Sequence, residues 1–89
     1  MKYTIKWNPQ AFKVLKKLPK HITQRVLNKL DVVAEEPFRF FEHFEGHKEY
    51  KLRIGDYRAL IEVRDEENLL LIKVFDHRGK VYKRSTNII

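Results

Sequence analysis

Residues 50–61 read Tyr50-Lys51-Leu52-Arg53-Ile54-Gly55-Asp56-Tyr57-Arg58-Ala59-Leu60-Ile61, and this stretch decides the fold. Apolar and polar side chains alternate on both sides of Gly55-Asp56, a pair suited to a tight hairpin turn with positive φ. A two-residue loop at this point places Arg53 directly opposite Arg58. The stretch therefore predicts an antiparallel hairpin with Arg53 and Arg58 on one face and Lys51 one pleat away on the same face.

Like charges that face each other across two strands destabilise a sheet, so this cluster needs a reason. Cations that converge on one strand face favour the binding of an anion, and a phosphate backbone is the obvious candidate. The alternative is a solvated strand face, which is the usual meaning of an isolated charged residue. Acidic neighbours on this face are expected only further along, at Glu49 and Glu62.

The residues before this hairpin predict a strand followed by two helices. Alternation over residues 3–7 indicates a half-buried first strand. Asn8-Pro9 then supplies an N-cap and a proline at the first helical position. One amphipathic helix is expected to end at Pro19, and a second to run from about Ile22 to just before Pro37.

The second half of the chain predicts a loop and then a sheet. Residues 37–47 have no clean period, and we interpret them as a loop that packs its phenylalanines under the sheet edge. Strands are expected at roughly 48–54, 57–64 and 69–75, with a short last strand around 80–83. The segment 69–75 is apolar on both sides apart from Lys73, which is typical of a central strand.

The resulting order, β-α-α-β-β-β-β, predicts a single α+β domain over residues 1–89. It consists of an N-terminal strand, a helical hairpin and an antiparallel β-meander, with both helices on one sheet face. The helices are expected to cover the face that bears Tyr50, Leu52, Ile54, Tyr57, Ala59, Ile61 and Val63. Lys51, Arg53 and Arg58 are then left on an open basic face, where function should be sought.

Composition narrows the classes of function. The 89 residues contain no cysteine, which excludes thiol catalysis and thiolate metal sites and suits a reducing cytosol. Neither a signal peptide nor a membrane-spanning run is expected, so we predict a soluble, cytoplasmic protein. The net charge is +7, and residues 1–34 hold eight Lys or Arg against one acid. This basic first third favours a polyanionic partner, nucleic acid first, although a basic solubility face is the alternative.

A second cluster, Phe75-Asp76-His77-Arg78-Gly79-Lys80-Val81-Tyr82, follows the predicted central strand. Arg78 and Tyr82 are the natural additions to Lys51, Arg53 and Arg58. Four cations and a phenol would hold a phosphodiester, neutralise charge at a pentacoordinate phosphorus and transfer protons. A lysine beside other cations is displaced toward the neutral form that a general base needs. The alternative is that Arg78 is a turn residue and Tyr82 a rim aromatic.

No metal or other cofactor is expected. His43 and His47 are four residues apart, but they lie in a stretch that is hardly helical, and no HExxH pattern is present. His77 stands beside Arg78 and would be placed to assist proton transfer. No glycine-rich phosphate loop and no Ser/His/Asp arrangement is visible.

The chain as a whole resembles the RelE/ParE superfamily, the small toxins of type II toxin–antitoxin pairs. The resemblance rests on motifs in their order and spacing: Tyr3-x-Ile5-x-Trp7, Ala11-x-Lys13-x-Leu15-x-Lys17-Leu18, Glu36-Pro37, the sheet stretch Tyr50 to Arg58, and Phe75-Asp76-His77-Arg78 followed by Val81-Tyr82. It implies a RelE-like fold, and the RelE branch is favoured because all five polar positions are retained.

The RelE branch implies a ribosome-dependent endoribonuclease that cuts messenger RNA without metal, by attack of the 2′-OH on the scissile phosphate. Lys51, Arg53, Arg58, Arg78 and Tyr82 stand at the corresponding catalytic positions. The basic outer faces of the helices are expected to bind ribosomal RNA through Lys13, Lys16, Lys17, Lys20, Arg25 and Lys29. The resemblance also implies a RelB-like antitoxin, acidic and folding on binding, in a possible heterotetramer. The alternatives are a ParE-type gyrase inhibitor, which is not a nuclease, and a non-catalytic RNA-binding module.

Two departures from the RelE pattern bear on the mechanism. Arg53 occupies a place where the ribonuclease branch often has lysine, so Lys51 becomes the better candidate for a base. Phe44-Glu45-Gly46 stands where Leu-Lys-Gly is common, which removes one cation from the rim of the site.

Overall fold

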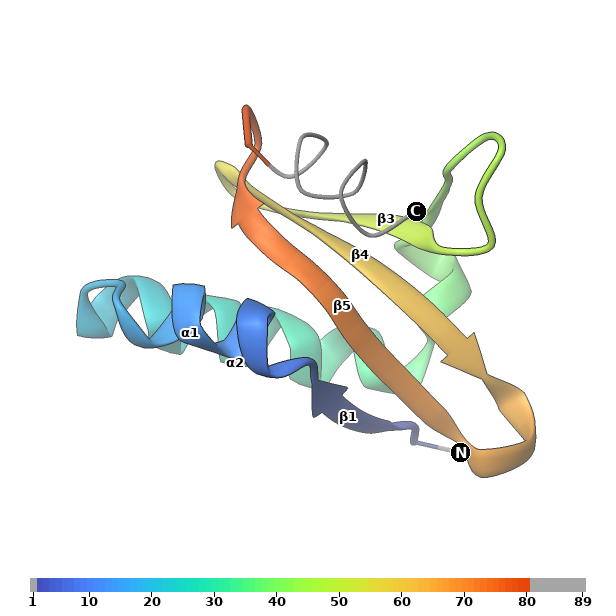
Figure 1. Cartoon of the computed structure of the whole chain (residues 1–89). Helices are drawn as coiled ribbons and strands as arrows, with labels where there is room; N and C mark the ends of the chain where they lie inside the picture. Colours follow the sequence, from blue (N-terminus) through green and yellow to red (C-terminus); the bar gives the residue numbers. More distant parts are fainter. Residues whose placement is uncertain (1, 81–89) are drawn as a thin grey trace.

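The computed structural model describes residues 2–80 and has two helices and a five-stranded mixed sheet (Figure 1). The chain runs through β1 (Thr4–Trp7), α1 (Pro9–Lys16), α2 (Lys20–Glu35), η1 (Pro37–Arg39), β2 (Glu42–His43), β3 (Tyr50–Ile54), β4 (Tyr57–Arg64), η2 (Asp65–Glu67) and β5 (Leu69–His77), where η1 and η2 are short 3₁₀ turns. The sheet order is β1-β5-β4-β3-β2. The predicted α+β class is confirmed.

Local sequence signals explain where the helices begin and end. The side chain of Asn8 accepts a hydrogen bond from the Gln10 backbone N–H, and Pro9 opens α1. The second helix begins at Lys20, slightly earlier than expected, because the carbonyl of Pro19 already accepts bonds from the next turn. It ends before Pro37, which cannot continue a helix. Within residues 2–80, neither helix is long and apolar enough to cross a membrane.

The predicted central strand is confirmed, because β5 lies between β1 and β4. It pairs in parallel with β1, from Thr4 with Leu69 to Trp7 with Ile72, and antiparallel with β4. A parallel partner needs a crossover connection, which the helical hairpin begins. A strand paired on both edges is largely buried: Leu70 and Ile72 are fully buried on the helix side, and Val74 is 3% exposed on the other face.

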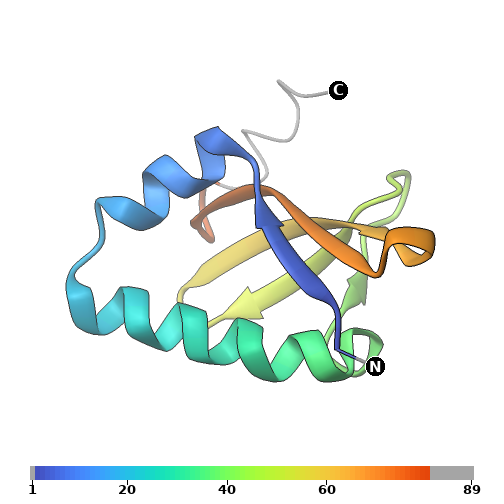
Figure 2. The same cartoon turned by 90° about the horizontal axis from the view of Figure 1, so that it is seen from below.

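Both helices cover one face of the sheet, as predicted (Figure 2). Leu52, Ala59 and Ile61 of the sheet pack into one core with Val26 and Leu30 of α2. Each is less than 5% exposed, and full burial of such an aliphatic side chain is worth about 1.5–3 kcal/mol. This apolar burial fixes which face of the hairpin points away from the helices.

The prediction of a plain loop at residues 37–47 was incomplete. The stretch contains the turn η1 and the two-residue strand β2, which adds to the sheet edge by pairing Glu42 with Lys51. Phe38 and Phe41 do pack against Tyr50 near that edge, as expected. The periodicity was unreadable because a two-residue strand is shorter than one alternation.

The predicted last strand at 80–83 falls almost wholly outside the described residues. Lys80 itself lies in a turn, and its N–H donates to the carbonyl of His77. The strand β5 also extends two residues beyond its predicted end, to His77.

Candidate functional site

The β3–β4 hairpin has the predicted register. Ile54 pairs with Tyr57 and Arg53 with Arg58, so the two arginines face each other across the strands. Gly55 has a φ of 59°, a left-handed value that glycine adopts without steric cost. The turn therefore fixes two arginines on the sheet face that the helices leave uncovered, which we call the open face.

The open face also carries a buried carboxylate that the sequence analysis did not assign to the site. Asp76 of β5 pairs directly with Arg58 of β4, and it is only 7% exposed. Its Oδ1 accepts a hydrogen bond of 2.8 Å from the His77 N–H. The expectation of acids only further along, at Glu49 and Glu62, was therefore wrong. The negative charge of Asp76, on the strand next to Arg58, offsets part of the repulsion between the facing arginines.

Three arginines lie at the hairpin end of the sheet. Arg58 Nη1 donates to the carbonyls of Gly55 and Tyr57, at 3.1 and 3.0 Å, so its guanidinium lies against the turn. The Arg78 N–H donates to the Asp56 carbonyl at 2.9 Å, which ties the end of β5 to the same turn. Arg53, Arg58 and Arg78 are thus gathered at one end of the sheet, whereas predicted Tyr82 lies outside the described residues.

Lys51, the candidate base, lies beside an aromatic ring. Its Nζ is 5.7 Å from the centre of the Phe44 ring, a cation–π distance. Phe44 packs on Leu60 and Val74, which form a small second core on the open face. The prediction that the phenylalanines of residues 37–47 pack under the sheet edge was therefore wrong for Phe44. The open face around Lys51 is therefore partly apolar, and it is not uniformly basic.

His77 lies on the opposite face from the arginines. It pairs with Tyr57, and its ring lies edge-on to the Tyr57 ring at 5.8 Å between centres. Tyr57 in turn stacks on Phe75 of the main core. A strand alternates its side chains between faces, so Asp76 and His77 cannot both point to the open face.

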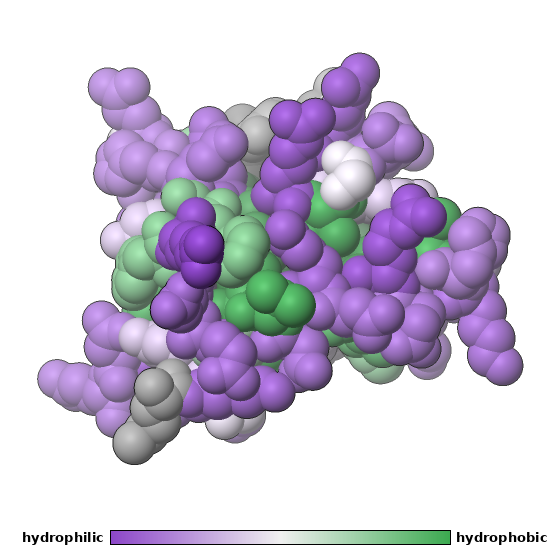
Figure 3. Space-filling view, turned by 180° about the vertical axis from the view of Figure 1, so that it is seen from behind, coloured by the Kyte–Doolittle hydropathy of each residue, from purple (hydrophilic) through white to green (hydrophobic). Residues whose placement is uncertain are grey.

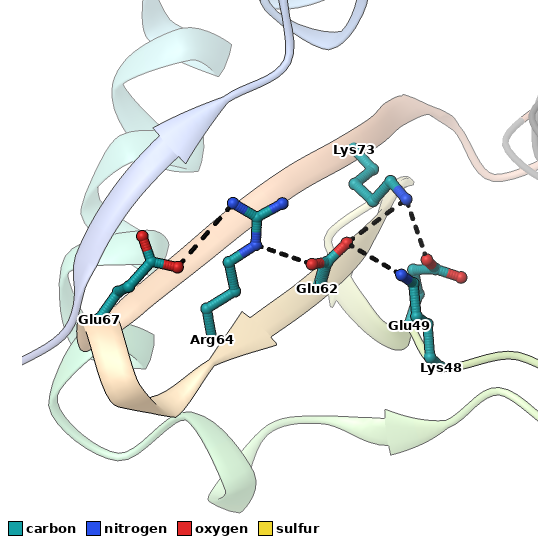
Figure 4. A network of polar contacts seen from close by, with 6 residues as sticks. All are labelled: Lys48, Glu49, Glu62, Arg64, Glu67 and Lys73. Atoms are coloured by element: carbon teal, nitrogen blue, oxygen red, sulfur yellow. Dashed lines mark hydrogen bonds and ion pairs between the residues drawn. The ribbon is translucent and has the colours of Figure 1, made fainter.

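In the other half of the open face, the charged side chains are paired in a network of ion pairs (Figure 4). Glu62 accepts from Arg64 Nε at 2.8 Å and lies 3.5 Å from Lys73 Nζ and 3.7 Å from Lys48 Nζ. Lys73 also contacts Glu49 at 3.2 Å. The hydrogen bond from Arg64 and the neighbouring cations hold the pKa of Glu62 below its ordinary value, against the opposing effect of burial. Among the described residues, the open-face cations outside this network, Lys51, Arg53 and Arg58, therefore lie toward the hairpin end.

A bulge in β5 makes this network possible. Leu60 pairs with Val74 and Ile61 with Ile72, which leaves Lys73 as the extra residue on β5. A bulge places two successive residues opposite one on the partner strand. Lys73 can then join Glu62 on the open face although its neighbour Val74 packs there too.

Glu62→Gln is expected to destabilise the fold and to flatten its dependence on pH. The lowered pKa of Glu62 means that its stabilising effect is present above the ordinary glutamate range and is lost as the pH falls through the lowered value. Loss of the charge-assisted hydrogen bond from Arg64 at a half-buried position would cost about 1.5–3 kcal/mol near pH 7. Urea unfolding of both chains from pH 7 to pH 3 measures this, and curves that stay parallel would contradict the assignment.

The helix cations form a separate basic surface. Lys13, Lys16, Lys17, Lys20 and Arg25 are exposed, as predicted. Lys29 departs from the prediction of a fully outward face, because its Nζ lies 4.5 Å from the centre of the Phe40 ring and the residue is half-buried. In residues 2–80, no three His, Asp or Glu side chains gather in a way that would hold a metal ion.

Comparison with known proteins shows the family to which the chain belongs. Residues 5–82 match the family described as ParE toxin of type II toxin–antitoxin system, parDE. The toxin–antitoxin complex RelBE2 of Mycobacterium tuberculosis contains a similar chain, at 30% identity and a TM-score of 0.77, covering 88% of this chain and all of that one. No curated protein sequence gives a significant match.

Two further solved structures are similar. In the archaeal RelE–RelB complex of Pyrococcus horikoshii the match has 31% identity and a TM-score of 0.75, over 90% of this chain and 99% of that one. A free mutant RelE toxin of E. coli matches at 25% identity and a TM-score of 0.75, over 100% and 99% of the two chains. The chain therefore belongs to the RelE/ParE superfamily of toxins from type II toxin–antitoxin systems, and its fold is RelE-like.

Proposed function

We propose that this toxin is a ribosome-dependent endoribonuclease that cuts messenger RNA without metal. One observation carries the proposal: Arg53 and Arg58 face each other on the sheet face that α1 and α2 leave uncovered, with Lys51 beside them. Facing cations destabilise a sheet, and a phosphate bound between them would offset their repulsion. The RelE-like fold supports the same reading.

The cleavage step needs a base, a stabiliser and a leaving-group proton. The ribose 2′-OH loses its proton and attacks phosphorus, the P–O5′ bond breaks, and the 5′ oxygen takes up a proton. The products are a 2′,3′-cyclic phosphate and a 5′-OH. Lys51 would act as base or as electrostatic partner, and Arg53 would position the phosphate. Arg58 and Arg78 would stabilise the phosphorane, while Tyr82 would stack on a base or transfer a proton.

Asp76 fits this scheme as a positioning group. It is buried directly opposite Arg58 and would limit where the guanidinium can settle. A buried carboxylate flanked by arginine is a poor nucleophile toward an anionic phosphodiester. We therefore assign no covalent role to it.

Programmed ribosomes that carry a labelled message test the proposal, in the presence of a chelator selective for transition metals that leaves the Mg²⁺ of the ribosome in place. The toxin is expected to cut within the decoding site and to leave a 2′,3′-cyclic phosphate end, which mass spectrometry identifies. Cleavage that disappears on chelation, or cleavage of naked message at the same rate, would contradict the proposal. The cytoplasm is the expected compartment, because ribosomes and message are found there.

A second candidate is a ParE-type gyrase inhibitor, which the family match over residues 5–82 favours. It would need no catalytic phosphate site. Purified gyrase with supercoiled DNA separates the two: double-strand breaks in the presence of the chain select the ParE reading, and intact ribosomal message supports it further.

We also propose a RelB-like antitoxin as partner, since the similar toxins of M. tuberculosis and P. horikoshii are found in RelB–RelE complexes. Apolar surface lies in the middle of the face seen in Figure 3, bordered by hydrophilic side chains. Among residues 2–80, the exposed large apolar side chains are Phe12, Leu27, Val32 and Phe38. An open groove of about 430 Å³ between β1 and α2 is lined by Ile5, Trp7 and Leu27 among others.

An acidic segment that folds on binding would suit this surface together with the net charge of +7. Its apolar side chains would enter the groove while its carboxylates meet the helix lysines. Pairing of two antitoxin chains would give a heterotetramer.

A further inference from the structure

The segment Phe44-Glu45-Gly46-His47 forms a tight turn that stacks two aromatic rings. The His47 N–H donates to the Phe44 carbonyl at 3.0 Å, and Gly46 has a φ of 82°. That φ is typical of the third residue of a type II turn, where a side chain would be strained. The Phe44 and His47 rings lie 3.9 Å apart between centres and are 5° from parallel. The backbone of the turn thus sets a face-to-face pair of rings.

Contacts on both sides hold this turn over the open face. Before it, His43 pairs with Tyr50 in the sheet. After it, Lys48 and Glu49 join the ion pairs of Glu62 and Lys73 (Figure 4). The Phe44 ring itself packs on Leu60 and Val74. A loop anchored at both ends and in the middle presents its outer ring in a defined place.

The ring pair lies next to the cation at the centre of the proposed site. Phe44 is within cation–π distance of Lys51 Nζ, and His47, stacked on Phe44, is half-exposed. RNA-binding proteins hold unstacked bases on aromatic rings beside cations that hold the phosphates. This arrangement is the reason to look for a base at His47.

We propose that His47, backed by Phe44, is a stacking surface for the base of a nucleotide adjoining the scissile phosphate, on the side of Lys51. The inference rests on the proposed RNA substrate and deepens it. His47 is a positioning residue, because it would act on the reacting phosphate only through the base that it orients. Stacking accepts every base, so the surface would favour flexible, weakly stacked positions in the message rather than one sequence.

The test uses ribosomes programmed with a message that carries 2-aminopurine at each position of the decoding-site codon in turn. The sugars of that codon lack the 2′-OH, so the message cannot be cut. Stacking quenches 2-aminopurine, and we expect the wild-type chain to quench it at one position. His47→Ala is expected to restore the fluorescence, and His47→Phe to quench it again. His43→Ala, at an exposed histidine on β2, is the matched control and should behave as wild type.

Cleavage of ordinary message by the same chains completes the test. His47→Ala is expected to lower kcat/KM by about tenfold or more, the range found when a stacking residue is truncated, and His47→Phe to recover it. A melting curve for each variant shows that the fold persists. Equal quenching and equal cleavage by wild type and His47→Ala overturn the stacking surface while leaving the nuclease proposal intact.

The two proposals fail in different ways. A wild-type chain that quenches 2-aminopurine through His47 but leaves ordinary message uncut supports the stacking surface and sinks the nuclease. A wild-type chain that quenches at no position overturns the stacking surface, whether or not it cuts.

Discussion

The Arg58→Ala/Arg78→Ala chain is expected to lose at least about two to three decades in the rate of message cleavage. Removing one donor that stabilises transition-state charge costs about 3–4 kcal/mol, and donors that act on one phosphate are not additive. Single-turnover cleavage on programmed ribosomes measures the loss. Because the loss lies in the transition state, the affinity for the ribosome should change little. Full activity in the double variant would exclude the proposed site.

Arg64→Ala is the matched control for this experiment. Arg64 lies on β4 and on the same face as Arg58, but it is already paired with Glu62 and Glu67. Its loss should lower stability without changing the cleavage rate. Arg58→Ala also removes two hydrogen bonds to the hairpin turn, each worth about 1 kcal/mol. Urea unfolding therefore has to accompany the kinetics, so that a partly unfolded chain is not mistaken for an inactive one.

The hairpin could be predicted from sequence because its signals are local. Gly55-Asp56 admits one loop length, and alternation on both sides then fixes the register that brings Arg53 opposite Arg58. The central position of β5 could be predicted from its apolar character, because a strand paired on both edges is more buried than an edge strand. These features follow from neighbours in sequence or from burial alone.

Asp76 was missed because its place depends on the register between β4 and β5. The register of β4 with β5 brings it to Arg58, and a bulge at Lys73 shifts that register within the strand. No local pattern announces a bulge of this kind. A usable signal did exist: the position next to buried Phe75 must face the other side of the sheet.

The predicted loop at residues 37–47, with a strand from about residue 48, was partly wrong for a related reason: the turn extends to Glu49 before β3 begins at Tyr50, and Phe44 packs on the open face. Its conformation is set by Gly46 and by ion pairs from Lys48 and Glu49 to Glu62 and Lys73, which are distant in sequence. The position of Gly46 is compatible with a type II turn, so the turn could be predicted from the sequence. The direction of the turn across the open face could not be predicted, since it follows from the packing of Phe44 on the sheet.

The second large effect is expected from reversing two charges at the junction of the helices. Lys17→Glu/Lys20→Glu should weaken ribosome binding and reduce the slope of log affinity against log salt by about 1.4–1.8, because each phosphate contact contributes about 0.7–0.9. Lys17 and Lys20 are both exposed. Lys17 caps the end of α1 and Lys20 starts α2, so the unfavourable glutamate at one terminus is offset by the favourable one at the other.

Sedimentation with ribosomes across a salt series measures the slope, and Lys6→Glu/Arg39→Glu is the control with the same net charge at exposed positions outside the helices. If the helix lysines contact ribosomal RNA, only the Lys17→Glu/Lys20→Glu chain changes its slope. Its KM on programmed ribosomes should rise while kcat stays near the wild-type value, since the change lies away from the hairpin end of the open face. If the lysines serve only solubility, the two double variants bind alike, and the ribosome must be held through the open face alone.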